Sequence, residues 1–246
     1  LTECDPVKVK GKADLVKTYK VEGRLKNSET RSNRQVFSRI VGRDKELNKL
    51  AFHVTGAIDG KGSVVNIVGE AGIGKSRLFA EFSKLDVVRN VTLLEGKAIS
   101  IGANMPFYPV VDLLKKWAGI EEEDNEKISL IRLESLVRTI DKNSVNDIVP
   151  FAATMMGIKL SHEYEKRVEG ITGESLEKLI FKNLRDLLIK ASKRKTLIIV
   201  MEDLHWADES SIEFLQILFN LTTEYSILFI NVFRPGFEHS GDIISK

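Results

Sequence analysis

The chain has 246 residues, of which 43% are hydrophobic and 29% are charged, and its formal net charge is +2. This composition is typical of a folded domain, and the near-neutral balance argues against nucleic acid or a membrane surface as the main partner. Cys4 is the only cysteine, so no internal disulfide forms and a reducing, cytoplasmic compartment is expected. The apolar runs 197–201 and 227–230 are too short to span a bilayer, so no membrane segment is expected here.

The first 38 residues differ from the rest of the chain in charge and in pattern. Residues 1–50 hold 13 Lys and Arg against 7 Asp and Glu, which is typical of a solvated basic segment. Alternating apolar and polar residues at 7–10 and 15–21, separated by GKAD, predict a short β-hairpin within residues 1–24. A lone two-stranded ribbon is marginal in water, so it should need a partner sheet. The polar stretch 25–38 predicts a linker.

From residue 39 onward, strand-like apolar runs alternate with amphipathic helical segments. Strands are expected at 63–68, 91–98, 196–202 and 226–233. Helices are expected at 43–53, 74–85, 173–192 and 209–221, and most of 107–192 is expected to be helical. This alternation predicts an α/β fold with a parallel sheet, helices on both faces and a helical insertion. Because the pattern stops after the fourth strand, we expect domain 39–246 to be cut short at Lys246, and the chain to extend before Leu1 as well.

A glycine-rich motif, GEAGIGKS at residues 69–76, fits the spacing G-x-x-x-x-G-K-[ST]. Backbone amides and a helix N-terminus then surround a triphosphate, because glycines let the chain approach it closely. Lys75 is expected to reach the outer phosphates, and the Ser76 hydroxyl is expected to bind Mg²⁺. The alternative is a glycine-rich turn without a ligand, which the flanking strand and amphipathic helix disfavour. The residues assigned to ATP binding in this motif are Gly69, Glu70, Ala71, Gly72, Ile73, Gly74, Lys75, Ser76 and Arg77.

Two carboxylates, Glu202 and Asp203, follow the apolar strand at 196–202. Ligands of open α/β sheets bind at the carboxyl ends of the strands, so we assign Glu202 to magnesium and Asp203 to the attacking water. Arg234 follows the next strand and is assigned to sensing the γ-phosphate, although an exposed arginine at a strand end is an equally good interpretation. The predicted catalytic set is Lys75, Glu202, Asp203 and Arg234, and the predicted metal ligands are Ser76 and Glu202.

Three further residues near the acidic pair favour structural roles. His205 and Trp206 are interpreted as packing residues beneath the carboxylates, since aromatic side chains contribute mainly through burial. Asp208 is interpreted as the N-cap of the helix at 209–221 rather than as a ligand.

Four segments in order resemble the ATPase domain of the signal-transduction ATPases with numerous domains (STAND), relatives of the AAA+ and origin-recognition ATPases. They are IVGRDKEL at 40–47, GEAGIGKSRL at 69–78, MEDLHWAD at 201–208 and VFRP at 232–235. The likeness is strongest to the ATPase that follows the cyclase in adenylyl cyclases and to MalT-like regulators. It implies the sheet order 5-1-4-3-2 with strand 5 beyond Lys246, and it places Val41, Gly42 and Arg43 near the adenine. Family members often have Asp where Glu202 stands.

The hairpin sequence VKVKGKADLVKTYKVEG at 7–23 resembles the final hairpin of class III nucleotidyl cyclase domains. That resemblance implies that Lys10 and Lys12 face a substrate triphosphate. The metal-binding aspartates of that family are not in this chain, so the chain by itself should make no cyclic nucleotide. The resemblance implies three parts: a cyclase hairpin at 1–24, a linker at 25–38 and an ATPase domain at 39–246.

Together these observations predict an ATP- and magnesium-binding regulatory module, a slow ATPase switch acting on a cyclase domain of the same chain. One alternative is a nucleotide-dependent scaffold that does not hydrolyse ATP. Another is the ATPase domain of a MalT- or LuxR-like transcriptional activator, which would need a helix-turn-helix beyond Lys246. A third is a parent protein that is chiefly a cyclase. A homo-oligomer is compatible with the resemblance, and nucleic acid is not expected as a partner of this region.

Overall fold

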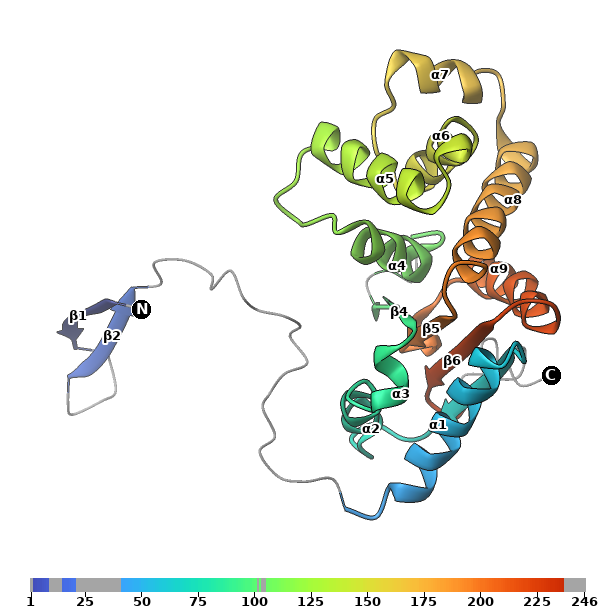
Figure 1. Cartoon of the computed structure of the whole chain (residues 1–246). Coiled ribbons are helices and arrows are strands. Elements are labelled where there is room, and N and C mark those ends of the chain that lie inside the picture. Colours follow the sequence, from blue (N-terminus) through green and yellow to red (C-terminus); the bar gives the residue numbers. More distant parts are fainter. Residues whose placement is uncertain (1, 9–14, 21–40, 101, 103–104, 237–246) are drawn as a thin grey trace. The chain divides into compact units, whose positions relative to one another are not determined.

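The computed structural model describes residues 2–8, 15–20, 41–100, 102 and 105–236 (Figure 1). The chain divides into two compact units, residues 1–39 and residues 40–246. The predicted linker at 25–38 lies outside the described residues. Within the described part of the chain, no helix combines the length and the apolar character that crossing a bilayer requires.

The first unit is an antiparallel hairpin of two strands, β1 (Thr2–Val7) and β2 (Val16–Lys20). Its side chains are almost all exposed, as expected for a ribbon without a core of its own. The hairpin was predicted, but its first strand was predicted at 7–10 and instead ends at Val7. The register between the strands shifts between Cys4 and Val7. Pro6 lies within this irregularity, where a strand tolerates a residue without a backbone N–H. Lys10 and Lys12 lie outside the described residues.

The second unit alternates helices and strands along the chain. Its strands are β3 (Ser63–Val68), β4 (Thr92–Lys97), β5 (Leu197–Glu202) and β6 (Ile227–Phe233). Its α-helices are α1 (Asp44–Ile58), α2 (Lys75–Phe82), α3 (Asp86–Arg89), α4 (Tyr108–Ala118), α5 (Glu126–Ile140), α6 (Val145–Met155), α7 (His162–Val168), α8 (Gly173–Ser192) and α9 (Glu209–Phe219). Short 3₁₀ helices are η2 (Lys142–Ser144), η3 (Leu204–Trp206) and η4 (Asn220–Thr223).

The four strands form one parallel sheet in the order β3-β6-β5-β4. The predicted order 5-1-4-3-2 numbers the core strands along the chain, so β3, β4, β5 and β6 correspond to strands 1, 2, 3 and 4. The observed order is then 1-4-3-2, which confirms the fold class and the predicted order of these four strands. The central strands read LIIVME and ILFINVF, the near-continuous apolar runs that a strand buried on both faces requires. A fifth strand beyond Lys246 stays a prediction.

Helices cover both faces of this sheet, which makes three layers (Figure 1). On β5, Ile198 and Val200 pack with α1, α2 and α3, whereas Leu197, Ile199 and Met201 pack with the layer that contains α4, α8 and α9. This division follows from the two-residue period of a strand, which sends successive side chains to opposite faces.

The stretch 107–192, predicted to be mostly helical, contains α4 to α8 and is confirmed as helical. Its first helix, α4, lies directly against β4 because Gly96 has no side chain. A Cβ on Gly96 would lie 2.4 Å from the carbonyl oxygen of Pro109, closer than any real contact. The N-terminal turn of α4 is therefore held against the end of an edge strand of the sheet.

Three helices differ in length from the sequence prediction. Helix α2 was expected to reach residue 85 but ends at Phe82. Helix α1 was expected to end at residue 53 but runs to Ile58, because Val54 and Ala57 continue its buried face. Helix α9 was expected to reach residue 221 but gives way to η4 after Phe219. The predicted N-cap of α9 is confirmed: Asp208 accepts a hydrogen bond from the Ser211 N–H at 3.0 Å.

Candidate functional site: a phosphate-binding loop beside an acidic strand end

The glycine-rich loop connects the end of β3 to the first turn of α2. Gly72 has φ +80° and Gly74 has φ +96°, a region that disfavours any side chain. No atom lies within 4 Å of where a Cβ would stand on either residue, so the backbone bend requires glycine and the space beside it is open. The Gly69 N–H donates to the Phe233 carbonyl at 3.3 Å, which ties the start of the loop to β6. The loop therefore presents open backbone at the carboxyl edge of the sheet.

Lys75, the first residue of α2, closes this loop on itself. Its Nζ donates to the Gly69 carbonyl at 2.6 Å and to the Glu70 carbonyl at 2.9 Å. A phosphate oxygen would have to replace these carbonyls as acceptor, which the charge-assisted bond to an anion favours. Ser76 follows in the first turn of α2, where the helix N-terminus favours anions. Arg77, also assigned to the nucleotide, forms an ion pair with Glu81 at 2.8 Å along the same helix.

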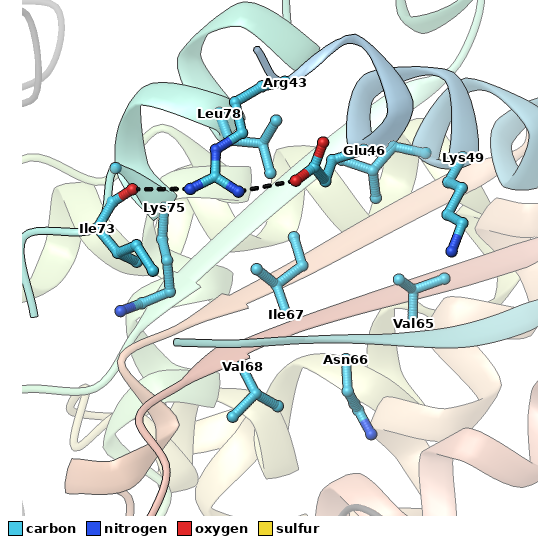
Figure 2. Close-up of a pocket in the computed structure, with 12 residues that line it drawn as sticks. Arg43, Glu46, Lys49, Val65, Asn66, Ile67, Val68, Ile73, Lys75 and Leu78 are labelled. Carbon is cyan, nitrogen blue, oxygen red and sulfur yellow. Dashed lines mark hydrogen bonds and ion pairs between the residues drawn. The ribbon is translucent and has the colours of Figure 1, made fainter. Parts of the chain in front are cut away.

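The segment before α1 also reaches the glycine-rich loop. Arg43 donates through Nη2 to the Ile73 carbonyl at 3.2 Å and through Nη1 to Glu46 Oε1 at 2.7 Å (Figure 2). The Arg43 hydrogen bond is also the main reason why the pKa of Glu46 lies below its ordinary value. Gly42 has φ +75°, and the Val41 side chain is 87% exposed. Of the three residues predicted to lie near adenine, Arg43 contacts the loop, and the adenine assignment of all three stays a prediction.

A cavity of about 270 Å³ opens between α1, β3 and the start of α2. Its volume is near the lower end for small-molecule sites, so it suits part of a nucleotide rather than a whole triphosphate. Figure 2 shows Arg43 and Lys75 on the side of the loop and Lys49 on the side of α1. The lining is otherwise largely apolar and includes Leu50, Val65, Ile67, Ile73 and Leu78.

The acidic pair lies at the end of β5, two strands from β3 in the sheet. Burial raises the pKa of Glu202, a change that the nearby Lys97 opposes. Asp203 has φ +54° and ψ +34°, a left-handed conformation that Asp tolerates better than most residues. This bend turns the chain out of the strand into η3. The Asp203 Oδ2 lies 3.1 Å from the Nζ of Lys97, the last residue of β4.

Lys97 was not among the site residues predicted from the sequence. The signal was present, because Lys97 ends a strand that is expected to run parallel to β5. In the structure it stands beside Glu202 in the β4–β5 register. The prediction of which residues face each other required the strand order and the register, and neither can be read from one strand alone.

Several predicted site residues act electrostatically on His205. Its side chain is 5% exposed, and its ring lies 5.1 Å from that of Trp206, in agreement with a packing role. Burial lowers the pKa of His205; the Asp203 charge opposes this, and the Arg234 and Lys75 charges add to it. His205 is therefore within electrostatic range of the loop lysine, the second acid and the arginine after β6. Charged residues that follow β3, β5 and β6 in the chain thus act on His205 together.

The oxygen donors at this edge suit magnesium. Mg²⁺ prefers hard oxygen ligands and commonly keeps waters and substrate phosphates, so it needs few protein side chains. Ser76, Glu202 and Asp203 supply such oxygens, and the described residues contain no group of three His, Cys, Asp or Glu that would hold a metal alone. That donor set fits an ion carried with a triphosphate. The shared coordination of one ion by Ser76 and Glu202 stays a prediction.

A parallel sheet with a glycine-rich loop between β3 and α2 and acids at the end of β5 defines a P-loop ATPase. Residues 39–230 match the family described as the AAA ATPase domain, so the chain belongs to this family. The chain is also 22% identical over 198 residues to an uncharacterized protein of Rhizobium meliloti (strain 1021). That match covers 80% of this chain but only 19% of the relative's length.

Proposed function

We propose that the chain is a STAND-type regulatory module that binds ATP with magnesium and hydrolyses it slowly. The observation that carries the proposal is the convergence on residues 69–76: Lys75 bonds the loop carbonyls, Arg43 bonds the Ile73 carbonyl, and a cavity lies beside both. Membership of the AAA ATPase family supports nucleotide binding. The switch, its signal and its output are further parts of the proposal.

Each residue of the site would have a defined task. Lys75 exchanges the Gly69 and Glu70 carbonyls for the outer phosphates, while loop amides bind the remaining oxygens. Ser76 and Glu202 would hold Mg²⁺, and the bound ion would screen the charge of the phosphates. Asp203 orients the attacking water and accepts its proton. Arg234 binds the γ-phosphate. The adenine end of the site is lined by Val41, Gly42 and Arg43.

The output of the switch would be a cyclase domain of the same parent protein. The support is the sequence resemblance of the hairpin, together with the antiparallel pairing of β1 and β2. Bound ATP would hold one conformation of the module and hydrolysis would release it, as in other nucleotide switches. Cytoplasmic location and assembly into a homo-oligomer belong to the same proposal. The match covers only 19% of the bacterial relative, which agrees with a module inside a larger protein.

A second candidate is a nucleotide-dependent scaffold that binds ATP without hydrolysing it. The Lys97–Asp203 ion pair favours this candidate, because it occupies the carboxylate that would orient the water. The two candidates share the binding site and differ only in turnover.

Calorimetry with MgATP and a phosphate-release assay on the 246-residue chain test the proposal. The ATPase predicts saturable binding and slow release that Asp203→Asn abolishes while the affinity is kept. Glu209→Gln, an exposed acid at the start of α9, is the matched control and should change neither. Binding without release would support the scaffold. No binding of MgATP by the folded chain would contradict both candidates.

A further inference from the structure

One lysine joins the proposed water-orienting acid to the helical layer. Lys97 ends β4 and stands beside Glu202 in register, and its Nζ lies 3.1 Å from Asp203 Oδ2. The two side chains are 47% and 30% exposed, so the pair is accessible to solvent. Such pairs stabilise weakly and are easily exchanged for other partners. The ion pair therefore suits a reversible hold better than a permanent structural link.

The backbone of the same lysine is held from the opposite direction. Its N–H donates to Asp112 Oδ2 on α4 at 2.8 Å, and that oxygen also accepts from Lys116 at 2.7 Å. The next N–H, of Ala98, donates inward to the Glu202 carbonyl at 2.9 Å. Successive N–H groups of a strand point to opposite sides, so the Lys97 N–H is on the outer side of β4. Within the described part of the chain, β4 pairs with a strand on one side only.

Helix α4 contacts the end of β4 at two successive residues, Gly96 and Lys97. Gly96 lies so close to α4 that a Cβ there would be 2.4 Å from the Pro109 carbonyl oxygen and 3.0 Å from the Leu113 Cβ. One residue later, Asp112 holds the Lys97 N–H. Helix α4 in turn packs against α5, the next helix of the insertion. A displacement of α4 and α5 would therefore move the Lys97 backbone, and with it the position from which the Lys97 side chain reaches Asp203.

We propose that Lys97 is a positioning residue that restrains Asp203 from orienting the attacking water, and that α4 sets this restraint through Asp112. This inference rests on the proposed ATPase function and adds its regulation. The insertion then acts on hydrolysis without touching the nucleotide: when α4 shifts, the Lys97–Asp203 pair opens and the carboxylate becomes available to water. When α4 is in place, ATP binds and turnover is slow.

A set of variants tests the restraint through the split between kcat and KM. Lys97→Gln removes the charge that holds Asp203, and we expect kcat for phosphate release to rise up to about fivefold, the equivalent of about 1 kcal/mol. The KM and the calorimetric affinity for MgATP should not change. Lys115→Gln is the charge-matched control, because Lys115 is exposed on α4, and it should leave kcat at the wild-type value.

The Asp112 variants separate the regulatory link from a merely structural hydrogen bond. Asp112→Ala should raise kcat like Lys97→Gln, and the double variant should raise it no further, because both act through one restraint. Asp112→Asn keeps an oxygen that can accept from the Lys97 N–H, and it should return kcat toward the wild-type value. If Asp112→Ala does not fold, as urea unfolding would reveal, Asp112→Leu removes the acceptor while keeping the side-chain size; it should also raise kcat, and a wild-type kcat in folded Asp112→Leu would overturn the link to α4.

The outcomes distinguish this inference from the function on which it rests. Unchanged kcat in Lys97→Gln, with normal binding, would overturn the restraint and leave the ATPase proposal standing. Additive effects of Lys97→Gln and Asp112→Ala would overturn the link to α4. If the wild-type chain binds MgATP without release, release by Lys97→Gln would support the restraint and its absence would overturn it. If the wild-type chain does not bind MgATP, both proposals are wrong.

Discussion

Replacing Lys75 with alanine tests the phosphate-binding loop directly. In the free protein, Lys75 Nζ makes two hydrogen bonds to loop carbonyls, at 2.6 and 2.9 Å. Nucleotide binding would exchange these neutral acceptors for phosphate oxygens. The variant therefore loses the difference between the two sets of contacts rather than the whole energy of the lysine–phosphate bond.

The magnitude follows from that exchange. A hydrogen bond involving a charged group contributes about 1.5–3 kcal/mol net, so the MgATP affinity should fall between about tenfold and about 150-fold. The lower end is favoured, because the free protein already satisfies the ammonium group. The alanine variant should stay folded, since the side chain lies at the open edge of the loop and is not part of the buried core.

Isothermal titration calorimetry with MgATP measures this change. Lys84→Ala is the control, because it removes the same charge from an exposed ion pair with Glu81 at the far end of α2. It should bind MgATP as the wild-type chain does. An unchanged dissociation constant in folded Lys75→Ala would refute the assignment of the loop as a phosphate site.

Three further predictions concern the scaffold around the site. Gly96→Ala should lower the free energy of unfolding by about 1–3 kcal/mol in urea titrations, because its Cβ would collide with the backbone of Pro109. Lys190, the leading cause, and a serine hold the pKa of Asp141 well below its ordinary value. A carboxyl whose pKa is lowered by folding stabilises the fold at any pH above its pKa in the unfolded chain, which is about 4. This contribution should therefore be lost as the pH falls below about 4, and Lys190→Met should reduce that loss. Asn231→Leu should lower the free energy of unfolding by about 1 kcal/mol, because it removes the 3.0 Å hydrogen bond that the buried Asn231 Nδ2 donates to Asn66 Oδ1.

Each of these predictions has a contrary result. A Gly96→Ala chain as stable as wild type would mean that α4 is free to move away from β4. Equal acid sensitivity of the urea midpoint in wild type and Lys190→Met would contradict the role of the Asp141 ion pair. An Asn231→Leu chain as stable as wild type would mean that the hydrogen bond to Asn66 only offsets the cost of burying the Asn231 amide.

Much of the fold could be predicted because its signals are local. The central strands β5 and β6 are continuous apolar runs, and the glycine-rich loop has glycines where the backbone needs positive φ. The helix α8 was predicted at 173–192 and is observed at Gly173–Ser192, because its apolar residues repeat every three to four positions. The strand order came from the family resemblance rather than from any local pattern.

The features that could not be predicted from the sequence depend on contacts between distant residues. Lys97 was not assigned to the site, because its role depends on the register between β4 and β5. The first strand of the hairpin was placed too late, because an irregular register around Pro6 is not visible as alternation. The hydrogen bond from Asn231 Nδ2 to Asn66 Oδ1, at 3.0 Å, joins strands far apart in the chain.

By itself, the amino-acid sequence determined which segments become strands and helices and where the chain can bend around a phosphate. The spacing of apolar residues and the backbone conformations open to each residue depend only on residues close in sequence. They therefore act before any contact between distant residues forms. Only the tertiary structure decided that Arg43 bonds the Ile73 carbonyl and that Lys97 reaches Asp203. Those contacts require segments from separate parts of the chain to lie side by side, and side-chain charges interact strongly only over a few ångströms.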